Sequence, residues 1–429
     1  MTIHTVKAGE TLLRIGAMYG VTARQLAIWN ALGIDTALAV GQNLLVLTPA
    51  QTYIVQQGDT LNSIAGRFSL STLTLLRNNP DLHGQTQIAP GQELILSYAE
   101  EPTREISAHG YAYPSVGDVT IRSLLPDATM LMPFTYGIGA DGSLVVPDDQ
   151  ALIAKAYEYN VLPYMSLSTL TEEGGFSTER AIPLFNDPAL RERFIANVTS
   201  QMENRGYQGL DLDFEYLDPA YRQAYADFVG SLRSAVNARG YELIVALAPK
   251  TSADQPGLLY EAHDYAAIGA NSDRVMLMTY EWGYTYGPPM AVAPLASVKR
   301  VLDYAVTAIA PEKIIMGFPN YGYDWTLPFV QGTSRAQLIS SETAPQRAVR
   351  NNAEIQFDQT AQTPYFNYRD AQGLMHEVWY EDPRSAIAKY RLIDTYGLSG
   401  IGFWNYMRQF TAGFLSLHRM YSIRNVGQE

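Results

Sequence analysis

The segment Gly209-Leu210-Asp211-Leu212-Asp213-Phe214-Glu215-Tyr216 determines the fold expected for most of the chain. Apolar and acidic side chains alternate along it. Because successive side chains of a β-strand point to opposite faces, Asp211, Asp213 and Glu215 share one face. Burying like charges at this spacing is costly, and a strand selected only for stability would not carry them. The pattern therefore predicts a functional row of carboxylates on one strand.

Seven further apolar segments, separated by amphipathic helical patterns, extend from this strand in both directions. Eight strand–helix pairs in about 320 residues predict an α/β fold, a closed (β/α)8 TIM barrel. Between the last two strands, residues 321–382 add alternating runs that predict a small α+β insertion. The predicted strands centre on residues 106–112, 130–136, 162–167, 210–216, 243–248, 275–281, 314–319 and 401–406.

The first hundred residues contain an internal repeat. Val6-Lys7-Ala8-Gly9-Glu10-Thr11-Leu12 aligns with Val55-Gln56-Gln57-Gly58-Asp59-Thr60-Leu61 at an offset of 49 residues. Each unit reads as strand, helix, helix, strand, with a threonine that caps the first helix. We therefore expect two small βααβ modules and a separate barrel, each with its own core. The expected boundaries are residues 1–48, 51–98 and 104–429, with a linker at residues 98–103.

Composition narrows the class of partner. The formal net charge of −13 opposes nucleic-acid binding, which needs clustered Lys and Arg, whereas neutral sugars remain suitable. The chain has no cysteine, which excludes disulfides and thiolate chemistry, and its six histidines show no metal-ligand spacing. We expect no metal and no cofactor, and no run of residues is apolar for long enough to span a membrane. His109 is expected to be a hydrogen-bonded structural residue.

The carboxylate row predicts acid–base chemistry. Crowded carboxyl groups cannot all ionise near neutral pH, so at least one keeps a proton, as a general acid must. Catalytic side chains of TIM barrels lie at the C-terminal ends of the strands. Glu215 is furthest along the strand and is the predicted proton donor, with Asp213 behind it and Asp211 deeper as electrostatic support.

The same segment resembles the Asp-x-x-Asp-x-Asp-x-Glu signature of glycoside hydrolase family 18, with its acids on the last three positions. Further motifs follow in the family's order. They are Met278-Thr279-Tyr280 on the sixth strand, Gly317-Phe318-Pro319-Asn320-Tyr321-Gly322 on the seventh and Trp404 on the eighth. Three positions depart from the family pattern: Gln208 replaces the first Asp, Glu281 replaces the Asp after the tyrosine, and Ser166-Leu167-Ser168 replaces Ser-x-Gly-Gly.

The family resemblance implies a retaining, substrate-assisted glycosidase. In that mechanism the C2 acetamido oxygen of the sugar attacks C1 while Glu215 protonates the leaving oxygen. The resemblance assigns orientation of the amide to Asp213 and a hydrogen bond to its carbonyl to Tyr280. The implied substrate-binding residues of the barrel are Trp404, which stacks under the sugar, and Met278, Glu281 and Tyr321.

The amino-terminal repeats resemble the LysM domain, with Gly-Asp-Thr-Leu near the start and Gly-Gln-x-Leu before the last strand. This resemblance implies a groove for N-acetylglucosamine chains in each module. The same positions also read as turn and cap residues. The implied groove residues are Gly58, Asp59, Thr60, Leu61 and Asn79 in the second module, and Gly9, Thr11 and Asn30 in the first.

Together, two LysM-like repeats and a family 18-like barrel resemble the spore cortex-lytic N-acetylglucosaminidases of spore-forming bacteria. This implies hydrolysis of N-acetylglucosaminyl bonds in spore-cortex peptidoglycan during germination. Residues 1–7 lack the apolar core of a signal peptide, which fits deposition in the spore coat or cortex from the surrounding cytoplasm, or a cytoplasmic protein released by lysis. The expected partner is peptidoglycan or another N-acetylglucosamine-containing glycan, without nucleic acid or membrane insertion. The alternatives are a chitinase and a noncatalytic glycan-binding coat protein.

Overall fold

The computed structural model describes residues 1–171 and 175–424, so the last five residues of the predicted barrel domain lie outside it. Eight parallel strands close into a barrel in the order β5, β6, β9, β10, β11, β12, β13, β19, with β19 beside β5. The predicted TIM barrel is confirmed. The strands are β5 (Arg104–Ala112), β6 (Met130–Pro133), β9 (Leu162–Leu170), β10 (Gly209–Asp213), β11 (Glu242–Leu247), β12 (Arg274–Leu277), β13 (Ile314–Pro319) and β19 (Gly400–Trp404).

Amphipathic helices cover the outside of the barrel. Helix α8 illustrates their origin: the Asp187 side chain caps its first turn, Gly206 ends it with a φ of 80°, and Phe194, Val198 and Met202 form its buried face. The helices of the barrel domain are α5 (Asp118–Leu124), α6 (Gln150–Glu158), α7 (Ile182–Asn186), α8 (Pro188–Arg205), α9 (Arg222–Asn237), α10 (Tyr265–Asn271), α11 (Leu295–Ala308), α13 (Pro383–Tyr396) and α14 (Thr411–Met420). Short 3-10 helices are η2 (Leu125–Asp127), η3 (Thr178–Arg180), η4 (Pro219–Tyr221) and η5 (Pro311–Lys313). Among the described residues, no helix is both long enough and apolar enough to cross a membrane.

Three short strands extend the barrel sheet. β7 (Tyr136–Ile138) and β8 (Leu144–Val145) form a hairpin beside β9, and β20 (Tyr421–Ile423) pairs with the start of β5. The hairpin lies in the connection after β6, so it belongs to the end of the barrel at which the parallel strands finish.

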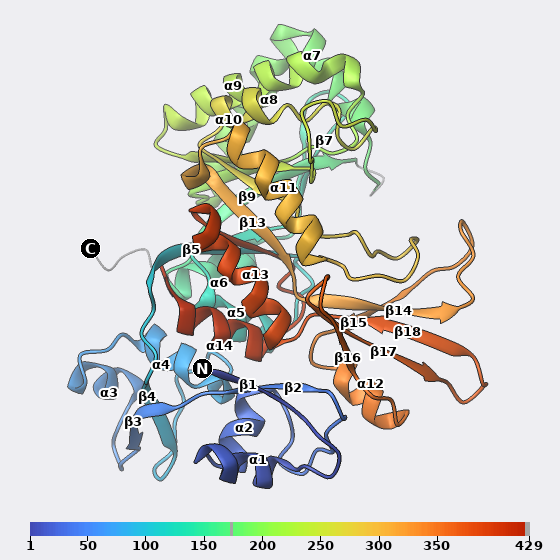
Figure 1. Cartoon of the computed structure of the whole chain (residues 1–429). Helices are drawn as coiled ribbons and strands as arrows, with labels where there is room; N and C mark the ends of the chain where they lie inside the picture. Colours follow the sequence, from blue (N-terminus) through green and yellow to red (C-terminus); the bar gives the residue numbers. More distant parts are fainter. Residues whose placement is uncertain (172–174, 425–429) are drawn as a thin grey trace.

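The insertion between β13 and β19 is a five-stranded antiparallel sheet in the order β15, β14, β18, β17, β16, with one helix (Figure 1). Its own apolar cluster includes Ile339, Phe366 and Val378. Its first strand starts two residues after β13 ends, so the sheet begins at the C-terminal face of the barrel. The elements are β14 (Tyr321–Leu327), β15 (Gln337–Ser340), α12 (Ala344–Arg350), β16 (Gln356–Asp358), β17 (Thr363–Arg369) and β18 (Met375–Trp379).

Several predicted strands are longer than the observed ones. β10 ends at Asp213 and β12 at Leu277. The chain turns shortly afterwards at Tyr216 and Glu281, whose φ values of 56° and 67° lie in the left-handed region that strands do not contain. The alternating pattern continues into these turns, so it does not mark the strand ends. Likewise β6 stops before residue 136 and β19 before residue 406.

Each amino-terminal repeat forms the predicted strand–helix–helix–strand module. In both, the two strands pair antiparallel and the two helices pack on them. The first module contains β1 (Thr2–Thr5), α1 (Leu12–Tyr19), α2 (Ala23–Trp29) and β2 (Asn43–Val46). The second contains β3 (Pro49–Ile54), α3 (Leu61–Arg67), α4 (Thr72–Asn78), η1 (Pro80–Leu82) and β4 (Glu93–Tyr98).

The modules are packed firmly on the barrel domain, below α14 and the insertion in Figure 1. Ala412 and Leu415 of α14 belong to the apolar cluster of the first module, and the core of the second module is continuous with that of the barrel. Asn43 donates a hydrogen bond to Asp382 at 2.7 Å, and the Tyr159 hydroxyl donates to the Gly84 carbonyl at 2.6 Å. The expectation of separate cores joined by a linker is therefore wrong. It assumed that the module surfaces face solvent, whereas apolar side chains of the modules pack against the barrel domain.

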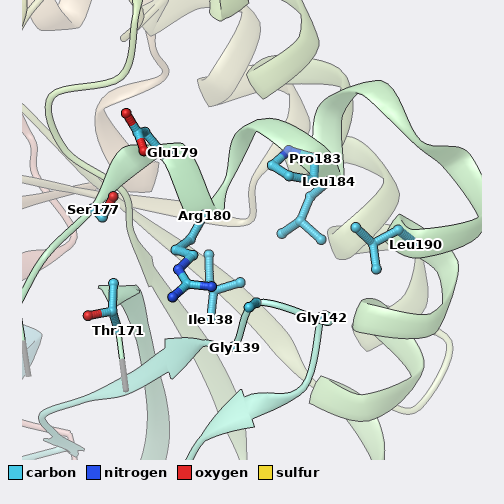
Figure 2. Close-up of a pocket in the computed structure, with 11 residues that line it drawn as sticks. Ile138, Gly139, Gly142, Thr171, Ser177, Glu179, Arg180, Pro183, Leu184 and Leu190 are labelled. Carbon is cyan, nitrogen blue, oxygen red and sulfur yellow. The ribbon is translucent and has the colours of Figure 1, made fainter. Parts of the chain in front are cut away.

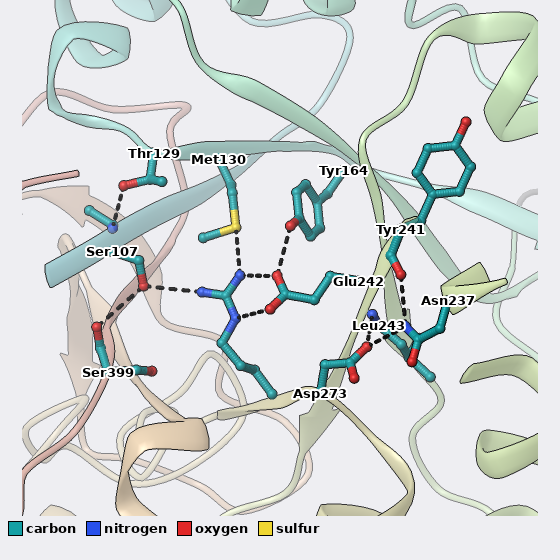
Figure 3. Close-up of polar contacts among 12 residues, drawn as sticks. Ser107, Thr129, Met130, Tyr164, Asn237, Tyr241, Glu242, Leu243, Asp273 and Ser399 are labelled. Atoms are coloured by element: carbon teal, nitrogen blue, oxygen red, sulfur yellow. Dashed lines mark hydrogen bonds and ion pairs between the residues drawn. The ribbon is translucent and has the colours of Figure 1, made fainter. Parts of the chain in front are cut away.

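A polar network closes the barrel at the N-terminal ends of its strands (Figure 3). Arg274 donates from Nε to Glu242 at 3.0 Å and from Nη1 to the Ser107 hydroxyl at 3.3 Å, and the Tyr164 hydroxyl donates to Glu242 at 2.8 Å. These contacts hold four strands, β5, β9, β11 and β12, together. The network explains the charged residues at this end of the barrel without a catalytic role.

His109 of β5 is fully buried in the barrel, but neither ring nitrogen has a hydrogen-bond partner among the described residues. The prediction of a hydrogen-bonded histidine is wrong in that respect. Burial, together with the charge of Arg274, lowers the pKa of His109 to about 3, so the ring is neutral. Gly402 leaves room for it, since a Cβ there would lie 2.4 Å from Nε2.

A buried ion pair joins the insertion to α13. Lys389 Nζ lies 2.7 Å from Glu381, and both side chains are 1% exposed. We expect Lys389→Met to lower the free energy of unfolding by about 3–5 kcal/mol, because it leaves the Glu381 charge buried without its partner. Urea denaturation measures this. The double variant Glu381→Leu/Lys389→Met removes both charges and should recover most of the loss, and equal losses in the two proteins would contradict the account.

Candidate active site

The three acids lie on one side of β10 and its extension, as the alternation predicts. Asp211 is fully buried and accepts a hydrogen bond from the Tyr111 hydroxyl at 3.0 Å. Asp213 is the last residue of the strand, and Glu215 lies two residues beyond it. One oxygen each of Asp211 and Asp213 is buried and has no partner among the described residues. Unpaired buried carboxylate oxygens are rare in native structures, so these two distinguish the end of β10 from an ordinary core.

Burial shifts the pKa values of these carboxyl groups upward. Burial raises the pKa of Asp211 to about 7, against the hydrogen bond from Tyr111, and burial with the Asp211 charge raises the pKa of Asp213 to about 7. Burial, with the charges of Asp213 and Glu281, raises the pKa of Glu215 to about 8. Glu215 therefore carries its proton at neutral pH, which is the state a general acid requires.

Tyr280 and Glu281 follow β12 and form the next wall of the site. Tyr280 is 8% exposed, and a Cβ at Gly317 would lie 2.8 Å from its ring, so the glycine makes space for it. Glu281 is open to solvent, and its carboxylate accepts hydrogen bonds from the hydroxyls of Tyr321 and, at 3.1 Å, Tyr323. Glu281 and Tyr321, both predicted from the sequence, are thus hydrogen-bonded to each other.

Trp404 forms an aromatic wall at the end of β19. Its ring centroid lies 5.0 Å from that of Phe134, 5.4 Å from Tyr111 and 6.3 Å from Tyr113. Trp404 remains partly exposed, so its ring is packed by its neighbours yet accessible to a ligand. Met278 is partly buried and packs against the barrel core. A sugar ring can stack on a supported indole of this kind.

His263 supports the segment that carries Glu215. Its Nδ1 accepts a hydrogen bond from the Ala248 backbone at 2.9 Å, and its Nε2 lies 2.9 Å from the Phe214 carbonyl, so Nε2 is the donor. Burial is the main cause that lowers the pKa of His263 to about 4, which keeps the ring neutral. Sequence reasoning missed His263, which lies in an irregular loop, and Tyr111. The alternation of His109 and Tyr111 on the first strand, continued by Tyr113 just after it, was the available signal for Tyr111.

The departures from the family motif lie at different distances from the three acids of β10. The Gln208 side chain donates to the Tyr157 hydroxyl at 2.8 Å on the exterior, away from the carboxylates. Ser166 and Ser168 are buried on β9, in register with Asp211 and Asp213. The replacement by Gln208 therefore leaves the acidic row intact, whereas the two serines lie beside it.

A cavity of about 480 Å³ lies beside α7 (Figure 2). It is lined by the loop after β7 and by residues around α7, with Ile138, Arg180 and Leu184 among them. None of the acids of β10 lines it, so the cavity is separate from the carboxylate centre. Within residues 1–171 and 175–424, no group of three or more His, Asp or Glu side chains has metal-binding geometry.

The predicted LysM groove loops are exposed. Gly9 and Gly58 have φ values of 76° and 87°, and an added Cβ would meet nothing within 4 Å at either position. Thr11 and Thr60 cap α1 and α3, and Asp59 accepts a hydrogen bond from the Gln56 backbone at 2.8 Å. These residues shape the loops, and contact with a glycan stays a prediction for them.

Three other predicted groove residues have structural side chains. Leu61 is 1% exposed in the module core, so its side chain cannot reach a glycan. The Asn79 amide is 3% exposed and binds the backbone of Leu75 and Ile95, and Asn30 binds that of Leu26 and Leu45. The side chains of Leu61 and Asn79 are therefore not free to contact a glycan, and the amide of Asn30 is already occupied. A place in the groove for these residues stays a prediction. A repeated Asn at a helix end fits either role, and the sequence could not separate them.

This barrel, with its acidic row and indole wall, has the architecture of a glycosidase, and the family comparison agrees. Residues 164–408 match the model of glycosyl hydrolases family 18, and residues 4–46 and 53–97 match the LysM domain. The chain belongs to glycoside hydrolase family 18 and carries two LysM domains.

Similar proteins extend the match over the whole chain. A cortical fragment-lytic enzyme of Bacillus subtilis is 38% identical over 426 residues, covering 87% of this chain and 98% of that protein. Another from Bacillus anthracis is 35% identical and covers 99% of both chains. The crystal structure of the Bacillus cereus spore cortex-lytic enzyme SleL superposes with a TM-score of 0.84 at 34% identity, covering 100% of this chain and 99% of that one.

Proposed function

We propose that this protein hydrolyses N-acetylglucosaminyl bonds of spore-cortex peptidoglycan, or of its fragments, during germination. The observation that carries this proposal is the end-to-end similarity, modules and barrel together, to cortical fragment-lytic enzymes. The barrel provides groups for the chemistry, since burial favours the protonated form of Glu215 and the partly exposed indole of Trp404 can support a sugar ring. The proposed substrate is thus a glycan that contains N-acetylglucosamine.

In the proposed mechanism, the C2 acetamido oxygen attacks C1 as the bond from C1 to the leaving oxygen breaks. Glu215 gives its proton to the leaving oxygen. Asp213, whose free oxygen faces no protein donor, accepts the amide N–H and aligns it, and the Tyr280 hydroxyl donates to the acetamido oxygen. Water then attacks C1, the bond from C1 to the acetamido oxygen breaks and regenerates the acetamido group, and the water gives a proton to Glu215, which restores the acid and leaves the product with retained configuration.

We assign glycan binding to residues 1–48 and 51–98 and catalysis to residues 104–429. The modules present their open loops at Gly9 and Gly58 on a body that is fixed to the barrel. In this proposal the modules retain the enzyme on an insoluble glycan while the barrel cleaves it. We place the enzyme in the spore coat or cortex, where such a substrate lies.

The alternatives are a chitinase and a noncatalytic coat protein. The retained Glu215, with its raised pKa, supports catalysis over binding alone. To test the substrate, purified protein is incubated with cortex fragments and with chitin oligomers, and the products are reduced and weighed by mass spectrometry. Reduced N-acetylglucosamine ends from cortex fragments are expected. New muramic acid ends alone, or cleavage of chitin only, would contradict the proposal.

The pH profile should report the raised pKa of Glu215. We expect kcat/KM to fall as pH rises through about 8, because the active general acid is then lost. Glu281→Gln removes a neighbouring negative charge, so the pKa of Glu215 should decrease and the alkaline limb should move to lower pH. Glu203→Gln on the exterior of α8 is the matched control. A limb that does not move in Glu281→Gln would refute the electrostatic assignment.

Bulk placed in the module loops should weaken binding to the wall. In the Glu215→Gln background, Gly9→Asn/Gly58→Asn should lower retention on insoluble peptidoglycan by about tenfold or more, since two linked weak sites act through effective concentration. Asn tolerates positive φ, so the fold is preserved. Gly20→Asn, at an exposed helix end with a φ of 71° and equal space, is the matched control. Equal retention of both variants in a pull-down would defeat the groove assignment.

A further inference from the structure

Lys250 lies three residues after β11, at the catalytic face of the barrel, and the residue is fully buried. Its Nζ donates to the carbonyls of Ala253 and His263, both at 3.0 Å. These two hydrogen bonds join the start and the end of the loop that leads from β11 to α10. The buried ammonium thus fixes the backbone of His263, although no step of the proposed mechanism uses this lysine.

His263 extends this contact to the segment that carries the general acid. Its neutral ring donates from Nε2 to the Phe214 carbonyl at 2.9 Å. The Phe214 ring is stacked on two rings of α9, with centroid distances of 6.1 Å to Tyr225 and 6.0 Å to Phe228. Both the side chain and the carbonyl of the residue that precedes Glu215 are therefore held in place.

The position of Glu215 depends on this backbone support. Among the residues that the structure describes, none donates a hydrogen bond to its carboxyl group. Tyr216, the next residue, has a φ of 56°, so Glu215 lies in a turn beyond the paired part of β10. The reach of the carboxyl group towards a substrate is therefore set by the backbone at Phe214 and not by a hydrogen bond to the carboxyl group itself.

We propose that Lys250 is a positioning residue for the general acid Glu215. Through His263 it holds the Phe214 carbonyl, which keeps the Glu215 carboxyl group within reach of the leaving oxygen. This inference rests on the proposed function, because it takes Glu215 as the proton donor. A misplacement of about 1 Å in a reacting group can lower a rate by about a hundredfold. Lys250 thus acts on proton transfer without touching the substrate.

The test compares two substrates that share a muramoyl–N-acetylglucosaminyl disaccharide and differ in the group that leaves from C1 of the N-acetylglucosamine. One leaving group is a sugar, whose basic oxygen needs the proton of the acid, and the other is 3,4-dinitrophenolate, which leaves largely without it. For Lys250→Met we expect kcat/KM to fall by about 10–100-fold with the sugar and by about threefold or less with dinitrophenolate. Because both rates come from one preparation, a smaller folded fraction lowers them equally and leaves their ratio unchanged.

Lys313→Met is the matched control. Lys313 Nζ also donates to two backbone carbonyls, those of Gly269 and Ser272 at 2.8 Å, but at the opposite end of the barrel, just before β13. This variant should leave the ratio of the two rates unchanged. His263→Phe should show the same leaving-group dependence as Lys250→Met, and the double variant should be little worse than either, because the two side chains act through one contact.

Equal losses on the two substrates in Lys250→Met, or no loss, overturn the inference. Glu215→Gln separates that result from the proposed function, since it should lose far more activity on the sugar substrate than on the dinitrophenyl one. Equal losses in Glu215→Gln would overturn the assignment of the acid, and the inference with it. If Lys250→Met cannot be purified, His263→Phe decides, because equal losses there break the link to Glu215.

Discussion

Glu215→Gln is expected to lower kcat on soluble glycans by about three to four powers of ten, the upper part of the range for a lost proton-transfer group. The amide keeps the shape of the side chain but has no acidic proton to give to the leaving oxygen. The burial that raises the pKa of Glu215 acts against the charged form, so the neutral amide should be tolerated or mildly stabilising. Initial rates on a soluble oligosaccharide and thermal unfolding of the same preparation measure the two effects.

Glu203→Gln makes the same chemical change on an outer helix, where the carboxylate pairs with Arg239, and should retain full turnover. Retention of Glu215→Gln on insoluble peptidoglycan should also match the unmodified protein, because the modules lie apart from the acid. Turnover above about one-tenth of the original value in Glu215→Gln would exclude Glu215 as the essential acid.

Asp213→Ala should lower kcat by about two or more powers of ten, because it removes the group that aligns the acetamido nucleophile. The variant has a second, independent signature. The Asp213 charge contributes to the raised pKa of Glu215, so its removal should also move the alkaline limb of the pH profile to lower pH. Steady-state rates across pH measure both.

A thiazoline analogue of the cyclised intermediate separates alignment from general destabilisation. It should inhibit the unmodified enzyme at much lower concentration than free N-acetylglucosamine, since mimics of the transition state bind more tightly. In Asp213→Ala that preference should shrink. If the analogue keeps its full advantage there, Asp213 does not contact the amide, and the assigned role fails.

The carboxylate row was predictable because strand alternation and burial cost are local properties of Asp211, Asp213 and Glu215. The turn that ends β10 was not, because it depends on contacts with distant residues. His263, 48 positions after Glu215, binds the carbonyl of Phe214, and no sequence period reveals such a pair. Similarly, the hydroxyl of Tyr111 reaches Asp211 across the barrel.

The sequence pattern also did not predict the contacts between the amino-terminal modules and the barrel domain. The repeat predicted two βααβ units, but it carried no sign that α14 completes the core of the first. Asn79 illustrates the same limit within a module, since an Asn at a helix end suits a ligand or the backbone equally well. In the structure, the Asn79 amide nitrogen donates to the Ile95 carbonyl and its oxygen accepts from the Ile95 N–H, so the backbone of Ile95 occupies both ends of the amide.

The stereochemistry of hydrolysis tests the central claim most directly. A retaining, substrate-assisted mechanism must release the new N-acetylglucosamine end first as the β anomer, because two successive displacements occur at C1. Proton NMR of a fresh reaction mixture, recorded before mutarotation, resolves the two anomers. The account predicts initial accumulation of β, and initial accumulation of α would show a single inverting displacement and contradict the roles given to Glu215 and Asp213.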